Sequence, residues 1–411
     1  MRKEVKPELL IPAKGMEELK TAVRYGADAV YIGGEIFSLR AAAVNFGFDE
    51  MKEAVEFAHL HGVKVHVTAN ILAHNADLDE AEEYFKELYR INPDALIIAD
   101  PGMFELAGQY APGIERHIST QANNTNYRTF LFWQKLGAKR VVCARELSLK
   151  EIAGIREKIP EDMQIECFVH GAMCISYSGR CLLSNYFTGR DANKGACTHP
   201  CRWTYSVSEE TRPGQYLPVY ENERGTYIFN SKDLCMIEHI PELVNAGIDS
   251  FKVEGRMKNA LYVATTARTY RKALDDYFES PSKYEENLDL YREEIRKCTM
   301  RDFSTGFYFG KPDENSQIYD NNTYIKDYTY LGFAEETGAD GTFFVHQKNK
   351  FSVGDELEIM KPDGENISAR VLNIWDEEGA ETDSAPHPKQ KVKVKLSEDP
   401  EDGDIFRRRD E

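Results

Sequence analysis

Short apolar runs alternate with amphipathic stretches along the first 280 residues of the chain. Each run is nearly all apolar, which is typical of strands buried on both faces of a parallel sheet. The stretches between them place apolar residues three and four positions apart and often end at glycine, which predicts helices. The predicted strands are residues 8–13, 28–34, 64–70, 95–100, 116–121, 140–145, 164–169, 227–230 and 249–253.

The order of these elements predicts a β–α repeat and therefore an α/β fold. A TIM-like (β/α)8 barrel needs eight parallel strands, so we expect one of the predicted strands to be an extra hairpin strand in an insertion. An open doubly wound sheet is the alternative, but no Gly-x-Gly-x-x-Gly motif supports a nucleotide crevice. Predicted helices cover residues 16–25, 49–61, 79–90, 103–110, 127–136, 148–158, 233–246 and 260–277.

The pattern changes to period two near residue 329, with turns at Gly and Asp. Short strands at 330–334, 342–346, 356–360, 367–375, 391–396 and 405–407 predict a small all-β C-terminal barrel. We expect a TIM-like barrel at 1–280 with a Cys-rich loop at 171–204, a linker at 281–328 with one helix and an aromatic segment, and the small barrel at 329–411. This last part resembles the second-domain barrel of translation factors.

Polar residues follow the predicted barrel strands, at the end where TIM barrels carry their chemistry. These polar residues would form a ring around the barrel mouth that contains two arginines. Because guanidinium groups hold carboxylates in a bidentate manner, the ring of residues suits a small anionic ligand. Each residue could instead be a helix cap or a loop contact. The candidate residues are Asn70, Gln121, Arg145, His170, Glu254 and Arg256.

Four cysteines lie close together in the sequence with the spacing C-x6-C-x15-C-x3-C. They are Cys174, Cys181, Cys197 and Cys201. Thiolates select zinc or iron–sulfur clusters, and four of them suit either a tetrahedral zinc or a [4Fe–4S] cluster. Buried free thiols and disulfides are the alternatives.

The Cys-rich loop is basic and aromatic, although the whole chain carries a net charge of −18. Residues 171–204 contain four basic residues and one acidic residue, a sum of +3. This combination is typical of proteins that bind single-stranded nucleic acid, and the alternative is a loop with its own small core. The aromatic residues are Tyr177, Tyr186, Phe187 and Trp203.

The N-terminus lacks the apolar segment of a signal peptide, and no apolar run approaches the length of a membrane helix. We therefore expect a cytoplasmic protein without a membrane partner. In that reducing compartment the eight cysteines are not expected to form structural disulfides, which favours the metal site. Homo-oligomer formation is left open.

Residues 166–184 resemble the signature of the peptidase U32 family, E-x-F-x-x-G-[SA]-[LIVM]-C-x4-G-x-C-x-[LIVM]-S. The resemblance continues at residues 230–234 and 251–258. The matching signature residues are Glu166, Phe168, Gly171, Ala172, Met173, Cys174, Gly179, Cys181, Leu183 and Ser184.

Within this family the chain is most similar to the tRNA hydroxylation proteins. The resemblance implies a TIM-like barrel that converts the wobble uridine (position 34 of the tRNA) to 5-hydroxyuridine, without oxygen and with prephenate as co-substrate. It implies a [4Fe–4S] cluster on the four cysteines, with Cys235 as the reserve fourth ligand. Arg256 and Arg145 would hold the carboxylates of the dicarboxylate co-substrate, and Arg202 and Trp203 would receive an unstacked uridine of the tRNA anticodon loop.

Other functions stay open. The family name implies a peptidase, but the sequence has no His-Glu-x-x-His or Gly-x-Ser-x-Gly motif, and clustered thiols resemble metal ligands more than a nucleophile. Relatives that hydroxylate an rRNA cytidine suggest a different RNA target. A non-catalytic RNA-binding scaffold, or zinc in place of the cluster, are further alternatives.

Overall fold

The computed structural model describes residues 5–39, 45–174, 176–203, 221–222, 225–226, 232–311, 325–338, 340–387 and 389–410. The chain packs into two compact units. The first comprises residues 1–23, 27–258 and 301–324, and the second comprises residues 24–26, 259–300 and 325–411.

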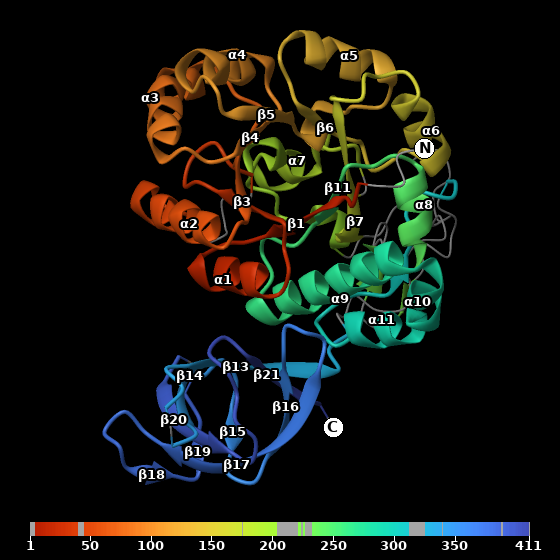
Figure 1. The fold of residues 1–411 in the computed structure, drawn as a ribbon. Helices are drawn as coiled ribbons and strands as arrows, with labels where there is room; N and C mark the ends of the chain where they lie inside the picture. Colours follow the sequence, from red (N-terminus) through yellow and green to blue (C-terminus); the bar gives the residue numbers. More distant parts are fainter. Residues whose placement is uncertain are drawn as a thin grey trace. The chain divides into compact units, whose positions relative to one another are not determined.

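Eight parallel strands form a closed ring in the first unit, which confirms the predicted TIM-like barrel (Figure 1). Seven of them pair in sequence order, and the eighth, β11, pairs with both the first and the seventh and so closes the ring. The ring strands are β1 (Glu8–Pro12), β2 (Ala29–Gly33), β3 (Lys64–Ala69), β4 (Ala95–Ile98), β5 (Glu115–Ile118), β6 (Arg140–Val142), β7 (Gln164–Gly171) and β11 (Ser250–Val253).

Helices surround this ring where the amphipathic stretches predicted them (Figure 1). Local capping explains where several begin. Asp100 accepts hydrogen bonds from the amides of the first turn of α4, and Ser148 with Glu151 forms a capping box on α6. These helices are α1 (Met16–Arg24), α2 (Phe48–Leu60), α3 (Asn75–Ile91), α4 (Pro101–Tyr110), α5 (Tyr127–Lys135), α6 (Leu149–Arg156) and α8 (Ile240–Asn245). The short helix α7 (Leu183–Thr188) lies in the Cys-rich loop, where no helix was predicted.

The predicted helix at 233–246 is wrong in its first part. Residues Asp233–Cys235 form strand β10, which pairs antiparallel with the end of β7, and only the later residues are helical. Strand β10 is thus an added strand beside the ring, whereas the predicted strand at 227–230 lies outside the described residues. Short strands β8 (Glu221–Asn222), β9 (Gly225–Thr226) and β12 (Phe303–Ser304) also occur in this unit.

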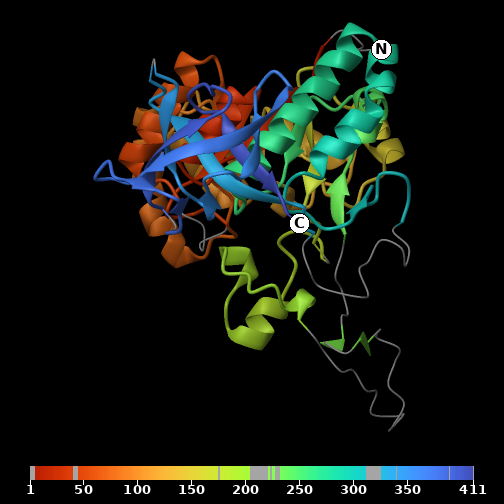
Figure 2. The same cartoon turned by 90° about the horizontal axis from the view of Figure 1, so that it is seen from below.

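Six antiparallel strands close a second, smaller barrel in the other unit, again as predicted. They are β13 (Tyr328–Glu335), β14 (Thr342–His346), β16 (Glu356–Met360), β17 (Asn366–Trp375), β20 (Lys391–Leu396) and β21 (Ile405–Arg409). The strands appear in blue in Figure 2. Shorter strands are β15 (Phe351–Ser352), β18 (Glu381–Thr382) and β19 (Ser384–Ala385).

Helices α9 (Ala260–Glu279), α10 (Pro281–Glu286) and α11 (Leu288–Ile295) belong to the same unit as the small barrel. A buried ion network joins them: Glu294 of α11 pairs with Arg268 of α9 and with Arg407 of β21, the latter at 2.7 Å. The one helix expected within the linker at 281–328 is instead two short helices, α10 and α11, which are divided at Asn287. The side chain of Asn287 there donates a hydrogen bond to Asp276.

None of the helices in the described parts of the chain has the length and apolar character needed to span a bilayer.

Candidate active site

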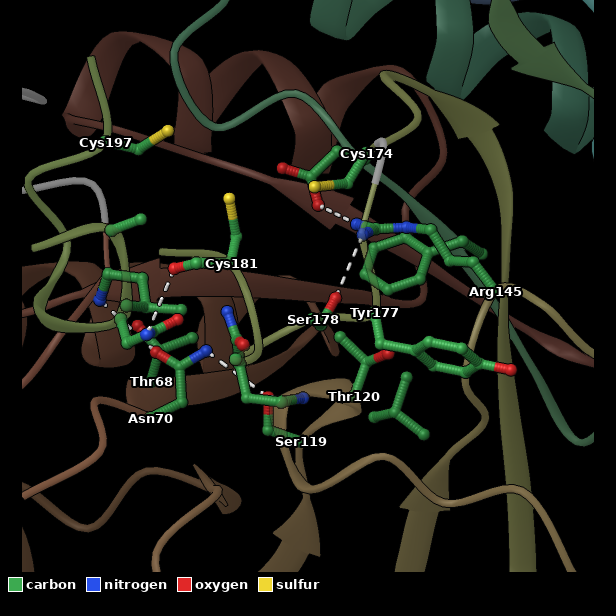
Figure 3. Close-up of a pocket in the computed structure, with 18 of the residues that line it drawn as sticks. Thr68, Asn70, Ser119, Thr120, Arg145, Cys174, Tyr177, Ser178, Cys181 and Cys197 are labelled. Carbon is green, nitrogen blue, oxygen red and sulfur yellow. Dashed lines mark hydrogen bonds and ion pairs between the residues drawn. The ribbon is translucent and has the colours of Figure 1, made fainter. Parts of the chain in front are cut away.

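A pocket opens where the barrel strands end and the Cys-rich loop covers them (Figure 3). Its volume is about 150 Å³. Side chains from the ends of β2–β7 and β11 form its floor and walls, and the loop forms its rim. The described lining includes Tyr31, Thr68, Asn70, Ile97, Ser119, Thr120, Gln121, Val142, Arg145, Phe168, Lys252, Glu254 and Arg256, together with Cys174, Tyr177, Ser178, Cys181, Cys197 and Cys201 of the loop.

Nine of the candidate binding and metal-ligating residues therefore meet around one pocket. They are Asn70, Gln121, Arg145, Glu254, Arg256 and the four cysteines Cys174, Cys181, Cys197 and Cys201. His170, Trp203 and Cys235 are described but do not belong to the lining. The side chain of Arg202 lies outside the described part of the structure.

The four rim cysteines are free thiols with at least partial exposure. Figure 3 shows the sulfur atoms of Cys174, Cys181 and Cys197 on one side of the pocket. Within the described residues, no three of these sulfur atoms lie within 4.8 Å of one another. The backbone N–H of His199 donates to Sγ of Cys197 at 3.4 Å, and hydrogen bonds to ligand sulfur atoms tune a bound iron–sulfur centre.

Hydrogen bonds within the Cys-rich loop, and between the loop and the barrel, hold the loop in place. Buried Ser184 accepts a hydrogen bond from the Thr198 amide at 3.1 Å, which ties α7 to the segment that carries Cys197. The side chain of Asn123 donates to the Ser178 carbonyl at 2.8 Å. At Gly171 the backbone has a φ of +105°, and a Cβ there would lie 2.1 Å from the carbonyl oxygen of Glu254, so glycine is required.

Two arginines lie on the pocket wall, in different environments. Arg145 donates to Glu254 at 2.9 Å and to the Ser178 hydroxyl at 3.3 Å, and its guanidinium lies 4.1 Å from the Phe168 ring centroid. Its buried Nε has no hydrogen-bond partner among the described residues. Arg256 is 4% exposed and donates to the hydroxyl of Ser38 at 2.6 Å and that of Thr68 at 2.8 Å.

A third cation, Lys252, lies on the pocket floor and was not singled out from the sequence. Its Nζ is 2.7 Å from Glu166 and 4.4 Å from the Tyr31 ring centroid. Lys252 lies on β11, and Glu254, two residues later, directly follows the end of that strand. The alternation of side chains along a strand gives both residues the same side, and this could have identified Lys252.

Glu166, the first signature residue, lies inside the barrel and not in the pocket lining. It pairs with Arg140 at 3.0 Å as well as with Lys252, and Arg140 also pairs with Glu8 at 2.5 Å. Burial alone would raise the pKa of Glu166, but Lys252 and Arg140 outweigh it and lower the pKa from 4.5 to about 2. Glu166 therefore stays ionised and holds Lys252 in place beneath the pocket.

His170 is buried, and its place reflects an irregularity in β7. Phe168 pairs with Lys252, but the next paired residue on β7 is His170 with Val253, so Val169 is an extra residue. This β-bulge shifts the alternation of side chains along β7 by one residue. The His170 side chain therefore lies on the same side of the sheet as Val253 and not on the pocket side. Its ring packs edge-on against Phe303 at 5.4 Å, and burial followed by the charge of Lys258 lowers its pKa from 6.5 to about 3.

Other residues were not predicted as pocket residues from the sequence. Tyr177 was singled out only as an aromatic residue of the loop and Gly179 only as a signature residue, and it is the folded loop that brings both, with Ser178, over the strand ends. Ser119 precedes a short 3-10 helix and lies near the side-chain amide of Asn70, at 3.4 Å. A polar residue of this kind after a strand is too common to be distinguished in one sequence.

Comparison with known proteins agrees with this arrangement of barrel, loop and small barrel. The sequence pattern of "Peptidase family U32" matches residues 14–318, and that of "Peptidase family U32 C-terminal domain" matches residues 326–407.

Three characterised relatives are similar to the chain. It is 44% identical to "tRNA hydroxylation protein P1" of Bacillus subtilis, over 95% of this chain and 92% of that protein. It is 38% identical to "tRNA hydroxylation protein P" of Escherichia coli, over 93% and 92% respectively. It is also 38% identical to the "23S rRNA 5-hydroxycytidine C2501 synthase" of Escherichia coli, over 66% of this chain but only 40% of that protein. Both the matched patterns and these similarities span most of the chain, which therefore belongs to peptidase family U32.

Proposed function

We propose that this protein hydroxylates a tRNA, converting the wobble uridine to 5-hydroxyuridine in an oxygen-independent reaction that uses prephenate as co-substrate and a [4Fe–4S] cluster. One observation carries the proposal: four free thiols and three cationic side chains border the same pocket at the mouth of the barrel. The names of the two relatives that cover most of the chain support tRNA as the substrate.

The donor set fits an iron–sulfur cluster. Cys174, Cys181, Cys197 and Cys201 all line the pocket, whereas Cys235 does not, so we assign the first four as ligands. Tetrahedral zinc with Zn–S bonds of about 2.3 Å would bring the sulfur atoms within roughly 4 Å of one another. Four cysteine thiols are also the ligand set that a [4Fe–4S] cluster requires, so Cys174, Cys181, Cys197 and Cys201 would hold it. When bound, the cluster would supply electron transfer beside the pocket.

The pocket floor suits a small dicarboxylate with an apolar ring. Arg145, Arg256 and Lys252 supply positive charge, and the rings of Tyr31 and Phe168 supply apolar walls. The unpartnered Nε of Arg145 offers a donor that no described residue uses. Guanidinium groups bind carboxylates through paired hydrogen bonds, so we assign the two carboxylates of prephenate to this floor.

Glu254 is the one acidic side chain among the described lining residues. Hydroxylation replaces the C5–H bond of uridine by C5–OH, a two-electron oxidation in which a proton leaves the ring carbon. In this proposal the co-substrate supplies the hydroxyl oxygen and accepts the two electrons. Glu254 pairs with Arg145 at 2.9 Å, which positions its carboxylate at the pocket, and we assign it as the acceptor of that proton. A base must leave its stack to reach such a pocket, and an unpaired loop nucleotide does so most easily. The arrangement therefore favours an RNA loop over a duplex.

Two other functions are less well supported. A peptidase would pair a nucleophile with a base, but no histidine occurs among the described pocket residues. The four thiols at the rim also resemble a set of metal ligands more than a single nucleophile. Hydroxylation of an rRNA cytidine is the second candidate, favoured by the similarity to the rRNA synthase, which extends over 40% of that protein.

The test begins with anaerobic purification of wild-type protein and of Cys201→Ala, Cys235→Ala and Cys298→Ala variants. We expect about four irons and four sulfides per wild-type chain and absorbance near ~400 nm. Cys201→Ala should lose iron and activity on tRNA, while Cys235→Ala and the buried-thiol control Cys298→Ala should keep both. A wild-type protein that contains one zinc and no iron would contradict the cluster.

A further inference from the structure

Three aromatic side chains form an exposed group on the Cys-rich loop, which we call the aromatic face: Tyr186, Phe187 and Trp203. Their exposed fractions are 81%, 46% and 40%. The rings of Tyr186 and Phe187 lie 5.1 Å apart, and those of Phe187 and Trp203 lie 6.2 Å apart. Large aromatic side chains that pack together at the surface usually mark a binding site, since isolated exposed ones are common but clusters are not.

The aromatic face lies beside the sulfur-lined rim of the pocket. Tyr186 and Phe187 follow Ser184 on α7. The Ser184 hydroxyl accepts a hydrogen bond from the amide of Thr198, the residue after Cys197. Trp203 follows Cys201 by two residues. A molecule that contacted these rings would therefore reach the mouth of the pocket with its neighbouring groups.

Charge on the same loop indicates which kind of partner fits. Residues 171–204 sum to +3 in a chain of −18, and the basic side chains of Arg180 and Arg190 are exposed. An apolar protein surface would match the rings but not the cations. Unpaired nucleic acid matches both, because its bases stack on aromatic rings and its phosphates pair with arginine.

We propose that the aromatic face stacks the unpaired nucleotides next to the target base, while Arg180 and Arg190 contact their phosphates. The protein would then select its target by the single-stranded context of an RNA loop and not only by the base in the pocket. This inference rests on the proposed function for the identity of the RNA. Each stacked base should account for roughly 5- to 100-fold in affinity.

The experiment measures binding of an anticodon stem–loop RNA by fluorescence anisotropy and hydroxylation kinetics for Tyr186→Leu, Phe187→Leu and Tyr186→Phe variants. Either leucine variant should raise Kd and KM at least about fivefold, with the cluster absorbance retained. Tyr186→Phe keeps the ring and should stay within about twofold of wild type. Phe132→Leu, an exposed aromatic side chain on α5 (54%), is the matched control and should change neither constant.

The outcomes separate this inference from the proposed function. Wild-type hydroxylation with unchanged Kd and KM in both leucine variants would overturn the aromatic face as an RNA site and leave the function standing. The predicted loss of RNA binding in a protein that hydroxylates no RNA would overturn the function alone. If the leucine variants change self-association in sedimentation experiments instead of RNA affinity, the face is an interface between copies of the chain and the inference is wrong.

Discussion

Replacement of Glu166 by Gln tests the buried ion network beneath the pocket. Glu166 is fully buried, and its carboxylate pairs with Lys252 and Arg140. Its pKa falls from 4.5 to about 2, which corresponds to roughly 3 kcal/mol of stability at neutral pH. Removing one partner of a buried ion pair typically costs about 3–5 kcal/mol, so both approaches give a similar magnitude.

Stability of the first barrel can be measured by urea-dependent hydrogen exchange in peptides that cover β7. Glu166→Gln should lower the free energy of opening by roughly 3 kcal/mol, because Lys252 and Arg140 remain buried with less compensating charge. The matched control Glu53→Gln changes an exposed residue of α2 and should alter it by less than about 0.5 kcal/mol. A Glu166→Gln, Lys252→Met double variant removes both charges and should recover part of the loss.

Two results would refute this reasoning. If Glu166→Gln behaves like Glu53→Gln, the network contributes no net stability. If the double variant loses the sum of both single effects, Glu166 and Lys252 do not depend on each other, and the proposed role of Glu166 in holding Lys252 at the pocket floor is wrong.

Three further predictions concern acid stability, the pocket and the loop. Burial lowers the pKa of His66 to about 4 and of His170 to about 3. Above pH 6.5 both side chains are neutral in the folded and the unfolded protein, but as the pH falls toward those values the unfolded protein takes up the protons first and each histidine lowers stability by up to about 1.4 kcal/mol per pH unit. His66→Gln should therefore flatten the fall of the urea midpoint between pH 6.5 and 4, and an unchanged slope would contradict a neutral buried His66. Arg145→Met should raise KM for prephenate by roughly 10- to 100-fold, with Arg145→Lys only partly restoring it, and kinetics with unaltered KM would remove Arg145 from the carboxylate site. Gly171→Ala should lower the free energy of unfolding by more than about 2 kcal/mol, because the added Cβ would lie 2.1 Å from the Glu254 carbonyl oxygen. Thermal unfolding measures this loss, and a variant that unfolds at the same temperature as the wild type would show that the close approach is absent.

The barrel strands could be predicted because parallel strands buried on both faces leave unbroken apolar runs, as residues Ala95–Ile98 of β4 illustrate. The six strands of the small barrel left an equally clear period-two pattern. The start of the 233–246 stretch was misread as helix because Asp233–Cys235 owes its extended form to pairing with β7, a tertiary contact that local periodicity does not record.

The site was predictable where chemistry is concentrated in sequence, as at the four cysteines, and where a strand end places a side chain at the mouth, as at Arg145 and Glu254. His170 also follows a strand, but the bulge at Val169 reverses the alternation, and a bulge leaves no mark in one sequence. Lys252 shares the alternation of Glu254 but could not be assigned to the pocket from one sequence, because its place on the floor depends on its pairing with Glu166 of another strand.

The central claim is tested most directly by nucleoside mass spectrometry of tRNA that has been incubated, under anaerobic conditions, with purified protein and prephenate. The account predicts 5-hydroxyuridine from the wild-type protein, none without prephenate, and none from a Cys174→Ala variant that retains its fold. Unmodified uridine after incubation with cluster-loaded wild-type protein, or equal product from the Cys174→Ala variant, would contradict it.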